Sequence, residues 1–155
     1  MDKYPSSFFI SSGVGTSAYE LVAFDNALLS AGISNYNLLK VSSILPCLCE
    51  RKDRVDLKEG SPLLTAYAAL SSDEKGTLLA TAVAAGIPKD RSKIGVIMEY
   101  KAVGISAEEA ESRVRSMVEE AMRNHGIELE EIVASSAAGV VETGYLSLIS
   151  AVVLW

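Results

Sequence analysis

Two stretches of the chain place apolar residues at the three-to-four-residue spacing of an amphipathic helix. The first lies between Ser17-Ala-Tyr-Glu20 and Gly32. The pattern S-x-x-E is typical of a helix start, because both side chains bind backbone N–H groups that have no partner within the helix, and glycine commonly ends a helix. We therefore expect a helix over about residues 17–31, with the apolar positions Leu21, Phe24, Leu28 and Ala31.

The second periodic stretch begins with the same pattern, Ser106-Ala-Glu-Glu109. It continues to about His125, and Gly126 follows. The spacing predicts a helix whose apolar stripe consists of Ala110, Val114, Met117, Val118 and Ala121.

The other apolar stretches are short and bounded by turn-forming residues, which favours strands. They cover residues 8–10, 38 to about 46, 62–71, 77–87, 93–103, 129–141 and 145–154. Alanine is frequent in them, so helix is a competing interpretation, but the recurring Thr and Val and the evenly spaced breakers favour strands. We expect Gly13 and Gly15 to end the first strand, and the charged residues 50–60 to form a solvated loop. Two helices covering six or seven strands make an α+β sandwich the economical fold.

The composition agrees with one domain over residues 1–155. The chain is 49% hydrophobic, with a mean hydropathy of +0.25, and a large interface shared between subunits is one explanation. No apolar run approaches the roughly 20 residues of a membrane span. The start, Met1-Asp-Lys-Tyr-Pro5, lacks the basic-then-apolar order of a signal peptide. A net charge of −6 disfavours nucleic acid as a partner. We therefore expect a cytoplasmic protein without nucleic-acid or membrane partners.

Few residues are suited to metal chemistry. Cys47 and Cys49 form a C-x-C, in which both side chains would point the same way on an extended chain, and His125 is the single histidine. This set does not make a Cys/His zinc site, and we expect no metal and two reduced thiols.

The pair Ser42-Ser43 lies in the otherwise apolar run Leu39–Pro46. On its own it could be two strand residues, and adjacent serines recur elsewhere in the chain. Buried hydroxyl groups need partners, however, and a serine hydroxyl beside a strained peptide bond can attack the preceding carbonyl. Attack by the Ser43 Oγ on Ser42, followed by β-elimination, would cut the chain and leave a pyruvoyl group at position 43.

Three further polar residues stand in apolar surroundings. Glu99 lies in a stretch that is apolar on both faces, where burial would raise its pKa and make it a usable proton donor; a salt-bridged structural glutamate is the alternative. Asp25 is surrounded by apolar residues three and four positions away, so it is either paired inside the protein or faces a bound cation. Asn37 could equally be an ordinary strand-start residue.

Four blocks together resemble the pyruvoyl-dependent arginine decarboxylases. The similarity extends from about residue 8 to the C-terminus, and the order and spacing of the blocks match. They are Ala23-Phe-Asp-Asn-Ala-Leu-Leu29, Ala31-Gly-Ile-Ser-Asn-Tyr-Asn-Leu38, Val41-Ser-Ser-Ile-Leu-Pro46 and Gly95-Val-Ile-Met-Glu-Tyr100.

The resemblance implies a fold, a reaction and roles for the site residues. The fold would be a four-layer αββα sandwich in a homotrimer. Cleavage between Ser42 and Ser43 would give a β chain (1–42) and an α chain (43–155), with Ser43 as pyruvoyl precursor and no metal or pyridoxal phosphate. Glu99 would be the general acid, Asp25 would lie near the far end of the substrate, and Asn37 would serve processing or substrate binding. The reaction would convert L-arginine to agmatine and CO2, in polyamine synthesis or acid resistance.

Two alternatives stay open from the sequence. One acidic residue, Asp25, does not separate arginine from lysine or ornithine. An uncleaved homologue that serves as a structural or regulatory subunit would have the same blocks.

Overall fold

The computed structural model describes residues 4–155, and within them the chain forms two helices and nine strands. The helices are α1 (Glu20–Ala31) and α2 (Ala107–Asn124). The strands are β1 (Ser7–Ser17), β2 (Asn37–Lys40), β3 (Ile44–Leu45), β4 (Glu50–Arg51), β5 (Pro62–Ser72), β6 (Leu78–Pro88), β7 (Gly95–Val103), β8 (Leu129–Val140) and β9 (Tyr145–Leu154).

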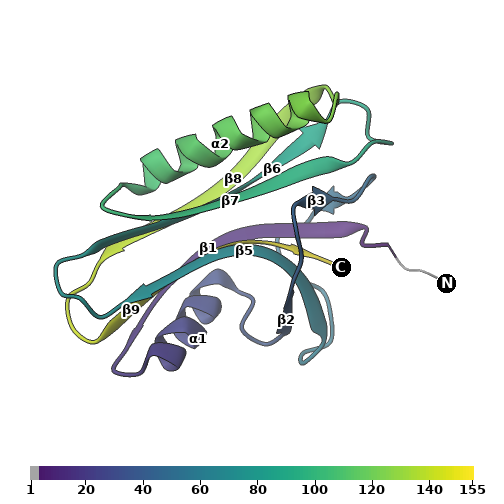
Figure 1. Ribbon diagram of the computed structural model, residues 1–155. Helices are drawn as coiled ribbons and strands as arrows, with labels where there is room; N and C mark the ends of the chain where they lie inside the picture. The colour runs from purple at the N-terminus through teal and green to yellow at the C-terminus, as the bar shows by residue number, and fades with distance from the viewer. Residues whose placement is uncertain (1–3) are drawn as a thin grey trace.

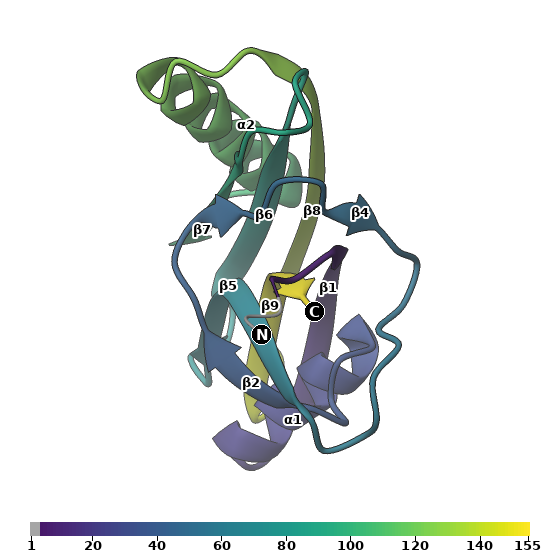
Figure 2. The same cartoon turned by 90° about the vertical axis from the view of Figure 1, so that its right-hand side faces the viewer.

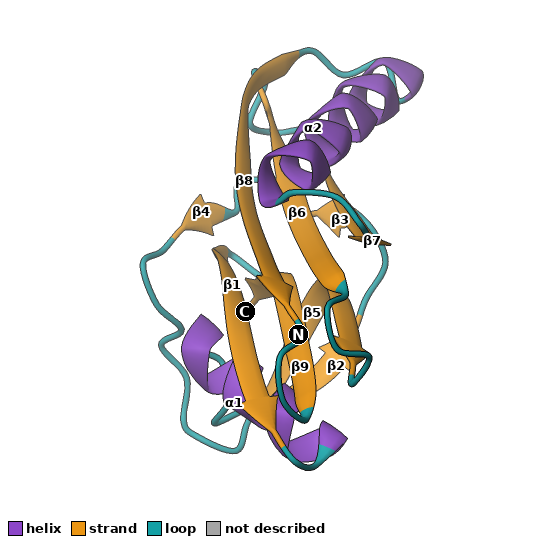
Figure 3. Cartoon of the chain, turned by 90° about the vertical axis from the view of Figure 1, so that its left-hand side faces the viewer, coloured by secondary structure: helices purple, strands orange, loops and turns teal. Residues whose placement is uncertain are grey.

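The elements build four layers (Figure 1). A five-stranded sheet in the order β2-β5-β9-β1-β4 faces a four-stranded sheet in the order β3-β7-β6-β8. Helix α1 packs on β1 and β9 of the first sheet, and α2 packs on β6, β7 and β8 of the second. Figure 3 shows the two helices on opposite outer sides of the strands. The predicted αββα sandwich is therefore confirmed.

The strands after residue 60 agree with the predicted bounds to within one or two residues, and helix is excluded for all of them. The strand expected from residue 38 to about 46 is wrong as one element, because it divides into β2 in the five-stranded sheet and β3 in the four-stranded sheet. The predicted loop over 50–60 also contains the short strand β4, which pairs parallel to β1. These two differences account for the larger number of strands.

The predicted end of the first strand at Gly13 and Gly15 is also wrong, because both glycines lie inside β1. A Cβ atom on Gly13 would overlap the carbonyl oxygen of Ala27, and one on Gly15 would overlap that of Ala23. The missing side chains therefore let the backbone of α1 approach the sheet closely. Glycine serves here for close packing rather than for a turn.

The two predicted helix starts have different outcomes. In α2 the Ser106 Oγ accepts a hydrogen bond from Glu109 N at 3.1 Å, as the sequence predicted. In α1 the N-cap is Tyr19, which has no side-chain capping bond, and the Ser17 Oγ instead accepts from Tyr19 N at 3.2 Å. Gly32 ends α1 in the left-handed conformation (φ 78°), as expected.

The inner core lies between the two sheets. Its buried side chains include Phe8, Ile10, Leu45, Val83, Ile97 and Val152. Hydroxyl groups cross the same space: the Ser12 and Ser135 Oγ atoms lie 2.8 Å apart, and the Thr81 Oγ1 and Ser150 Oγ atoms 2.9 Å apart. Each of these pairs joins one sheet to the other, so polar contacts add to apolar packing in fixing how the sheets align.

The close contact of α1 with β1 leads to a stability prediction. We expect Gly13→Ala to lower the free energy of unfolding by about 1–3 kcal/mol, because the methyl group has no space beneath the α1 backbone. Urea unfolding measures this change. The matched control is Gly139→Ala, whose Cβ would meet only the end of the Leu146 side chain, at 3.1 Å. Equal stability of the two variants would contradict this account of Gly13.

Candidate active site

Residues 41–43 carry the chain from one sheet to the other (Figure 2). At one end, Val41 N donates a hydrogen bond to Thr65 O of β5 at 3.0 Å. At the other, Ile97 N of β7 donates to Ser43 O at 2.7 Å. The peptide bond between Ser42 and Ser43 therefore bridges two anchored segments at the open edge of the sandwich.

The surroundings of the two serines differ from the expectation of a buried, strained strand. Ser42 is exposed and Ser43 is half-buried, because β2 and β3 belong to different sheets and the chain leaves both between them. Neither serine has a positive φ; among the described non-glycine residues only Leu48 does, at 59°. The peptide is thus held by its anchored ends rather than by a left-handed backbone torsion.

Glu99 lies on β7, on the face directed toward the other sheet. Side chains alternate along a strand, so Glu99 shares this face with Ile97, which is part of the inner core. The partner strand β3 pairs only with Gly95 and Val96. Beyond them β7 is an open sheet edge, and the Glu99 side chain keeps 34% of its surface exposed. The carboxyl group therefore stands at the mouth of the space between the sheets.

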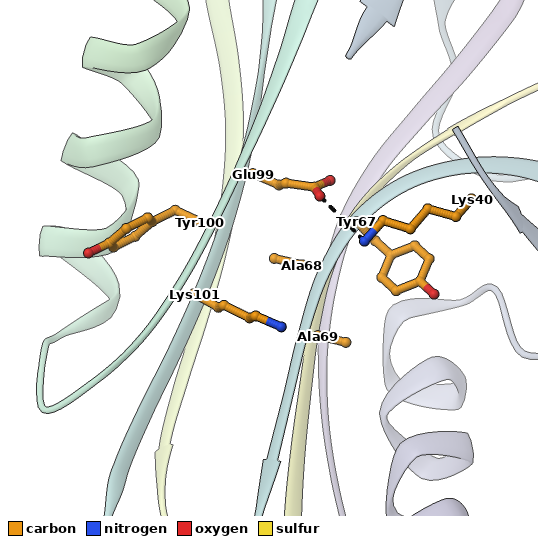
Figure 4. Close-up of a pocket in the computed structure, with 7 residues that line it drawn as sticks. All are labelled: Lys40, Tyr67, Ala68, Ala69, Glu99, Tyr100 and Lys101. Atoms are coloured by element: carbon orange, nitrogen blue, oxygen red, sulfur yellow. Dashed lines mark ion pairs between the residues drawn. The ribbon is translucent and has the colours of Figure 1, made fainter. Parts of the chain in front are cut away.

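A lysine from the other sheet reaches this carboxyl group. The Lys40 Nζ lies 3.6 Å from the Glu99 Oε1 and 4.8 Å from the centroid of the Tyr67 ring. Figure 4 shows the Lys40 ammonium between the carboxylate and the ring. The β2 and β5 strands thus supply a cation and its aromatic support, and β7 supplies the acid.

These side chains line a cleft of about 510 Å³, a size that suits a small-molecule ligand. The lining residues are Lys40, Tyr67, Ala68, Ala69, Glu99, Tyr100 and Lys101. Lys101 extends from β7 toward β5, whereas the Tyr100 ring points toward α2 (Figure 4). The cleft is open and carries both signs of charge, as a site for an amino acid requires.

Burial raises the pKa of Glu99 above its usual value. Loss of hydration is the largest cause, and the positive charges of Lys40 and Lys101 oppose it. The sequence predicted this direction. A carboxyl group that holds its proton more tightly is better suited to donate it near neutral pH.

Asn37 and Asp25 are not in this cleft. Asn37 begins β2, and its Nδ2 donates to Gly60 O at 2.9 Å, which ties β2 to the loop that precedes β5. Asp25 is exposed on α1, and the five-stranded sheet lies between that helix and β7 (Figure 1). Within one chain, Ser43 is hydrogen-bonded to β7, the strand that carries Glu99. Asp25 lies on the other side of the five-stranded sheet.

The apolar residues around Asp25 are largely exposed. Leu21 is 77% exposed, Val22 45% and Leu29 58%. The predicted helix stripe is wrong for Leu21, because α1 rests on the sheet through small residues, with Ala23 and Ala27 buried instead. Helix α1 therefore presents a second apolar surface, with Asp25 in it, to the outside of the chain.

Comparison with known proteins shows the family of the chain. Residues 7–155 match the family model described as pyruvoyl-dependent arginine decarboxylase (PvlArgDC). The chain belongs to this family. The pyruvoyl-dependent arginine decarboxylase of Methanococcus aeolicus is 39% identical over 153 residues, covering 99% of this chain and 92% of that protein. The one from Thermococcus kodakarensis is 40% identical over 152 residues, covering 97% and 96%.

A solved structure of a pyruvoyl-dependent histidine decarboxylase shows a partial likeness. It has a TM-score of 0.47 and 17% sequence identity. The matched region covers 64% of this chain and 52% of that one.

For this member of the pyruvoyl-dependent arginine decarboxylases, sequence analysis missed Lys40 and Tyr67. Lys40 is the one charged residue in the run Leu38–Pro46, and that isolation was a usable signal. Its partner lies on a distant strand, so the ion pair required the tertiary structure. Tyr67 carried no sequence signal, since aromatic residues are common in strands.

The cysteines do not point the same way. Cys47 is exposed, Cys49 is buried, and burial raises the pKa of the Cys49 thiol to about 11. Between residues 4 and 155, no cluster of three or more His, Cys, Asp or Glu side chains could hold a metal ion, and no helix is long and apolar enough to cross a bilayer. The prediction that the chain has no signal peptide rests on residues 1–5, and residues 1–3 lie outside the part that the structure describes.

The raised pKa of Glu99 leads to a pH prediction. The folded protein favours the neutral form of Glu99 over the charged form. The neutral form therefore contributes to stability below the usual pKa of 4.5, and this contribution is lost as pH rises through the raised pKa. In an uncleaved Ser43→Ala background, we expect Glu99→Gln to gain stability relative to its parent between acidic and neutral pH. Urea unfolding across that range measures the difference.

The control for this trend is Glu130→Gln on β8, because Glu130 is exposed and keeps its hydration. A Glu99→Gln variant that loses stability relative to its parent as pH rises would contradict the assigned direction.

Proposed function

We propose that this protein decarboxylates L-arginine to agmatine and CO2 with a pyruvoyl group formed from its own Ser43. Membership of the family over residues 7–155 supports the reaction. The observation that carries the proposal is the hydrogen bond from Ile97 N to Ser43 O at 2.7 Å. It joins Ser43 to β7, the strand that bears Glu99, and so supports a cut next to this acid.

In the proposed cleavage Ser43 supplies the attacking hydroxyl group. The Ser43 Oγ attacks the carbonyl carbon of Ser42, and the peptide bond becomes an ester with a free amino group on residue 43. β-Elimination then releases the carboxylate of Ser42 and leaves dehydroalanine at position 43. Water hydrolyses its imine tautomer to the pyruvoyl group and ammonia. The anchors at Val41 and Ser43 hold this peptide in place during the reaction.

Cutting the chain leaves the fold held together. The small chain, residues 1–42, contains β1, which pairs with β9 over ten residues and lies inside the five-stranded sheet. It also contains α1 and β2. We therefore propose one domain made of two associated chains, 1–42 and 43–155.

The surroundings of Ser43 fit a pyruvoyl group. The residue is half-buried and hydrogen-bonded to β7, the strand that also carries Glu99, whose pKa is raised. The pyruvoyl group, once formed, supplies an electron sink for the loss of CO2 from an amino acid. Glu99 then gives its proton to the substrate Cα, and Asn37 keeps β2 in register with the loop that precedes β5.

The substrate side chain needs a partner that this cleft lacks within one chain. We propose a homotrimer in which Asp25 of a neighbouring subunit completes the site and binds the guanidinium group of arginine. The exposed Leu21, Val22 and Leu29 beside Asp25 support an interface at this surface. A carboxylate accepts two parallel hydrogen bonds from guanidinium, so it is a suitable partner for the side chain of arginine. The free thiols support a cytoplasmic location.

Intact mass spectrometry tests the cleavage. We expect the purified protein to contain two chains, 1–42 and 43–155, with the larger blocked to N-terminal sequencing. Ser43→Ala should stay whole because it lacks the attacking hydroxyl group. Its matched control, Glu99→Gln, should be cut but should decarboxylate arginine roughly 10²- to 10⁴-fold more slowly. A parent protein that stays full-length after prolonged incubation would identify an uncleaved structural or regulatory homologue.

Asp25→Asn tests the substrate. Loss of a charged hydrogen-bond partner should raise the KM for arginine about 10- to 100-fold while cleavage continues. Glu20→Gln, which removes another exposed acidic group of α1, should not. The amine product is assayed with arginine, lysine, ornithine and histidine. Higher activity on lysine or ornithine in the parent would reassign the substrate.

Mixed subunits test the shared site. Coexpression of Asp25→Asn with Glu99→Gln should restore part of the activity, because some sites then combine the intact Asp25 of one chain with the intact Glu99 of another. Failure to restore activity in mixed oligomers would place both residues in one chain.

A further inference from the structure

We propose that Lys40 is a positioning residue for Glu99: supported by the Tyr67 ring, its ammonium group orients the carboxyl group at the mouth of the cleft. This inference rests on the proposed role of Glu99 as proton donor. It concerns a residue of the small chain that acts on a residue of the large chain.

Lys40 is a surface residue, yet its side chain has two defined contacts. The Nζ atom lies 3.6 Å from the Glu99 Oε1 and 4.8 Å from the Tyr67 ring centroid. A cation over an aromatic face is attracted by the ring electrons, and here the opposite side of the ammonium group meets a carboxylate. Two partners on two strands restrict a side chain that would otherwise move freely (Figure 4).

The backbone of Lys40 is also fixed. Lys40 pairs with Thr65 in the parallel register of β2 and β5, and the next residue, Val41, donates its N–H to Thr65 O at 3.0 Å. These contacts come before the proposed cut at Ser42. Lys40 therefore keeps its place when the chain is divided, because β2 is held by the sheet and not by its link to β3.

The ion pair adds little to the stability of the fold. The Lys40 and Glu99 side chains are 58% and 34% exposed, and solvent weakens such pairs to about 0–1 kcal/mol. The pair contains Glu99, the one acid among the residues that line the cleft, and Glu99 is on β7, the strand that anchors Ser43. Its effect therefore falls on the orientation and charge of Glu99.

The groups around Glu99 define what Lys40 contributes. From β7 itself Lys101 faces the cleft, and from β2 and β5 Lys40 and Tyr67 face it. The inner side consists of apolar core residues such as Val83, which is paired with Glu99 across β6 and β7. Loss of hydration raises the pKa of Glu99, and the charge of Lys40 is the largest effect that opposes it. Without Lys40, the carboxyl group would hold its proton to higher pH and would be free to turn.

The test compares Lys40→Met and Lys40→Arg in the mature enzyme. Intact mass gives the extent of cleavage, and kcat and KM for arginine are measured across pH. In Lys40→Met we expect kcat to fall roughly 10- to 100-fold through misplacement of Glu99. We also expect the alkaline limb of the kcat profile to move to higher pH, since Glu99 must be protonated to act. Lys40→Arg should restore both.

The matched control is Lys89→Met. Lys89 also pairs with a glutamate, Glu128, at 3.2 Å, and is 61% exposed, but it lies outside the cleft. It should leave kcat and the pH profile unchanged. A kcat loss in Lys40→Met without a shift of the alkaline limb, or one that arginine does not rescue, would overturn the positioning role.

A second measurement covers the case in which Lys40→Met is not cut. The carboxyl group of Glu99 is titrated by NMR in uncleaved Ser43→Ala with and without Lys40→Met. A higher pKa of Glu99 in the double variant supports the proposal, and an unchanged pKa overturns it. An inactive or uncut parent would instead count against the proposed function, so the two failures are distinguishable.

Discussion

The hydrogen bond from Ile97 N to Ser43 O is the contact on which the site depends. It binds Ser43 to the four-stranded sheet, two residues after Val41, which is bound to the five-stranded sheet. The Ser42–Ser43 peptide is thereby stretched across the edge of the sandwich, next to the strand that carries Glu99. A chain that continued β2 in its own sheet would keep the two serines away from that acid.

This arrangement requires the two sheets to keep one alignment, because Lys40 and Glu99 belong to different sheets. Apolar packing alone is tolerant of sliding, whereas hydroxyl pairs such as Ser12–Ser135 and Thr81–Ser150 have partners at one register only. The glycines of β1 act at the next layer, where they let α1 pack closely through small residues. The larger side chains of α1, Leu21 and Leu29, are left on the outside, around Asp25. The dense packing beneath α1 and the exposed apolar surface on its other side thus have the same origin.

The proposed reaction divides its parts between the two chains that cleavage produces. The large chain begins at Ser43 and carries Glu99, and the small chain carries Lys40 and Asp25. Pairing of β1 and β2 within the five-stranded sheet keeps the small chain in place without a covalent link. The five-stranded sheet separates Asp25 from the cleft of its own chain, which is why the proposed site needs the Asp25 of a neighbouring subunit.

The sequence by itself determined what short-range interactions decide. The Ser106 cap and the Gly32 end of α1 depend on backbone groups a few residues away, and the later strands follow from short apolar stretches between turn-forming residues. The motif around Ser42-Ser43 and the apolar setting of Glu99 could be recognised from the sequence because both are patterns of neighbouring residues. Tertiary structure alone decided the division of residues 36–49 between two sheets, the use of Gly13 and Gly15 for close packing, the Lys40–Glu99 pair and the distance of Asp25 from the cleft. Each of these depends on which strands lie side by side, and that is set by burial of the whole chain rather than by any local pattern.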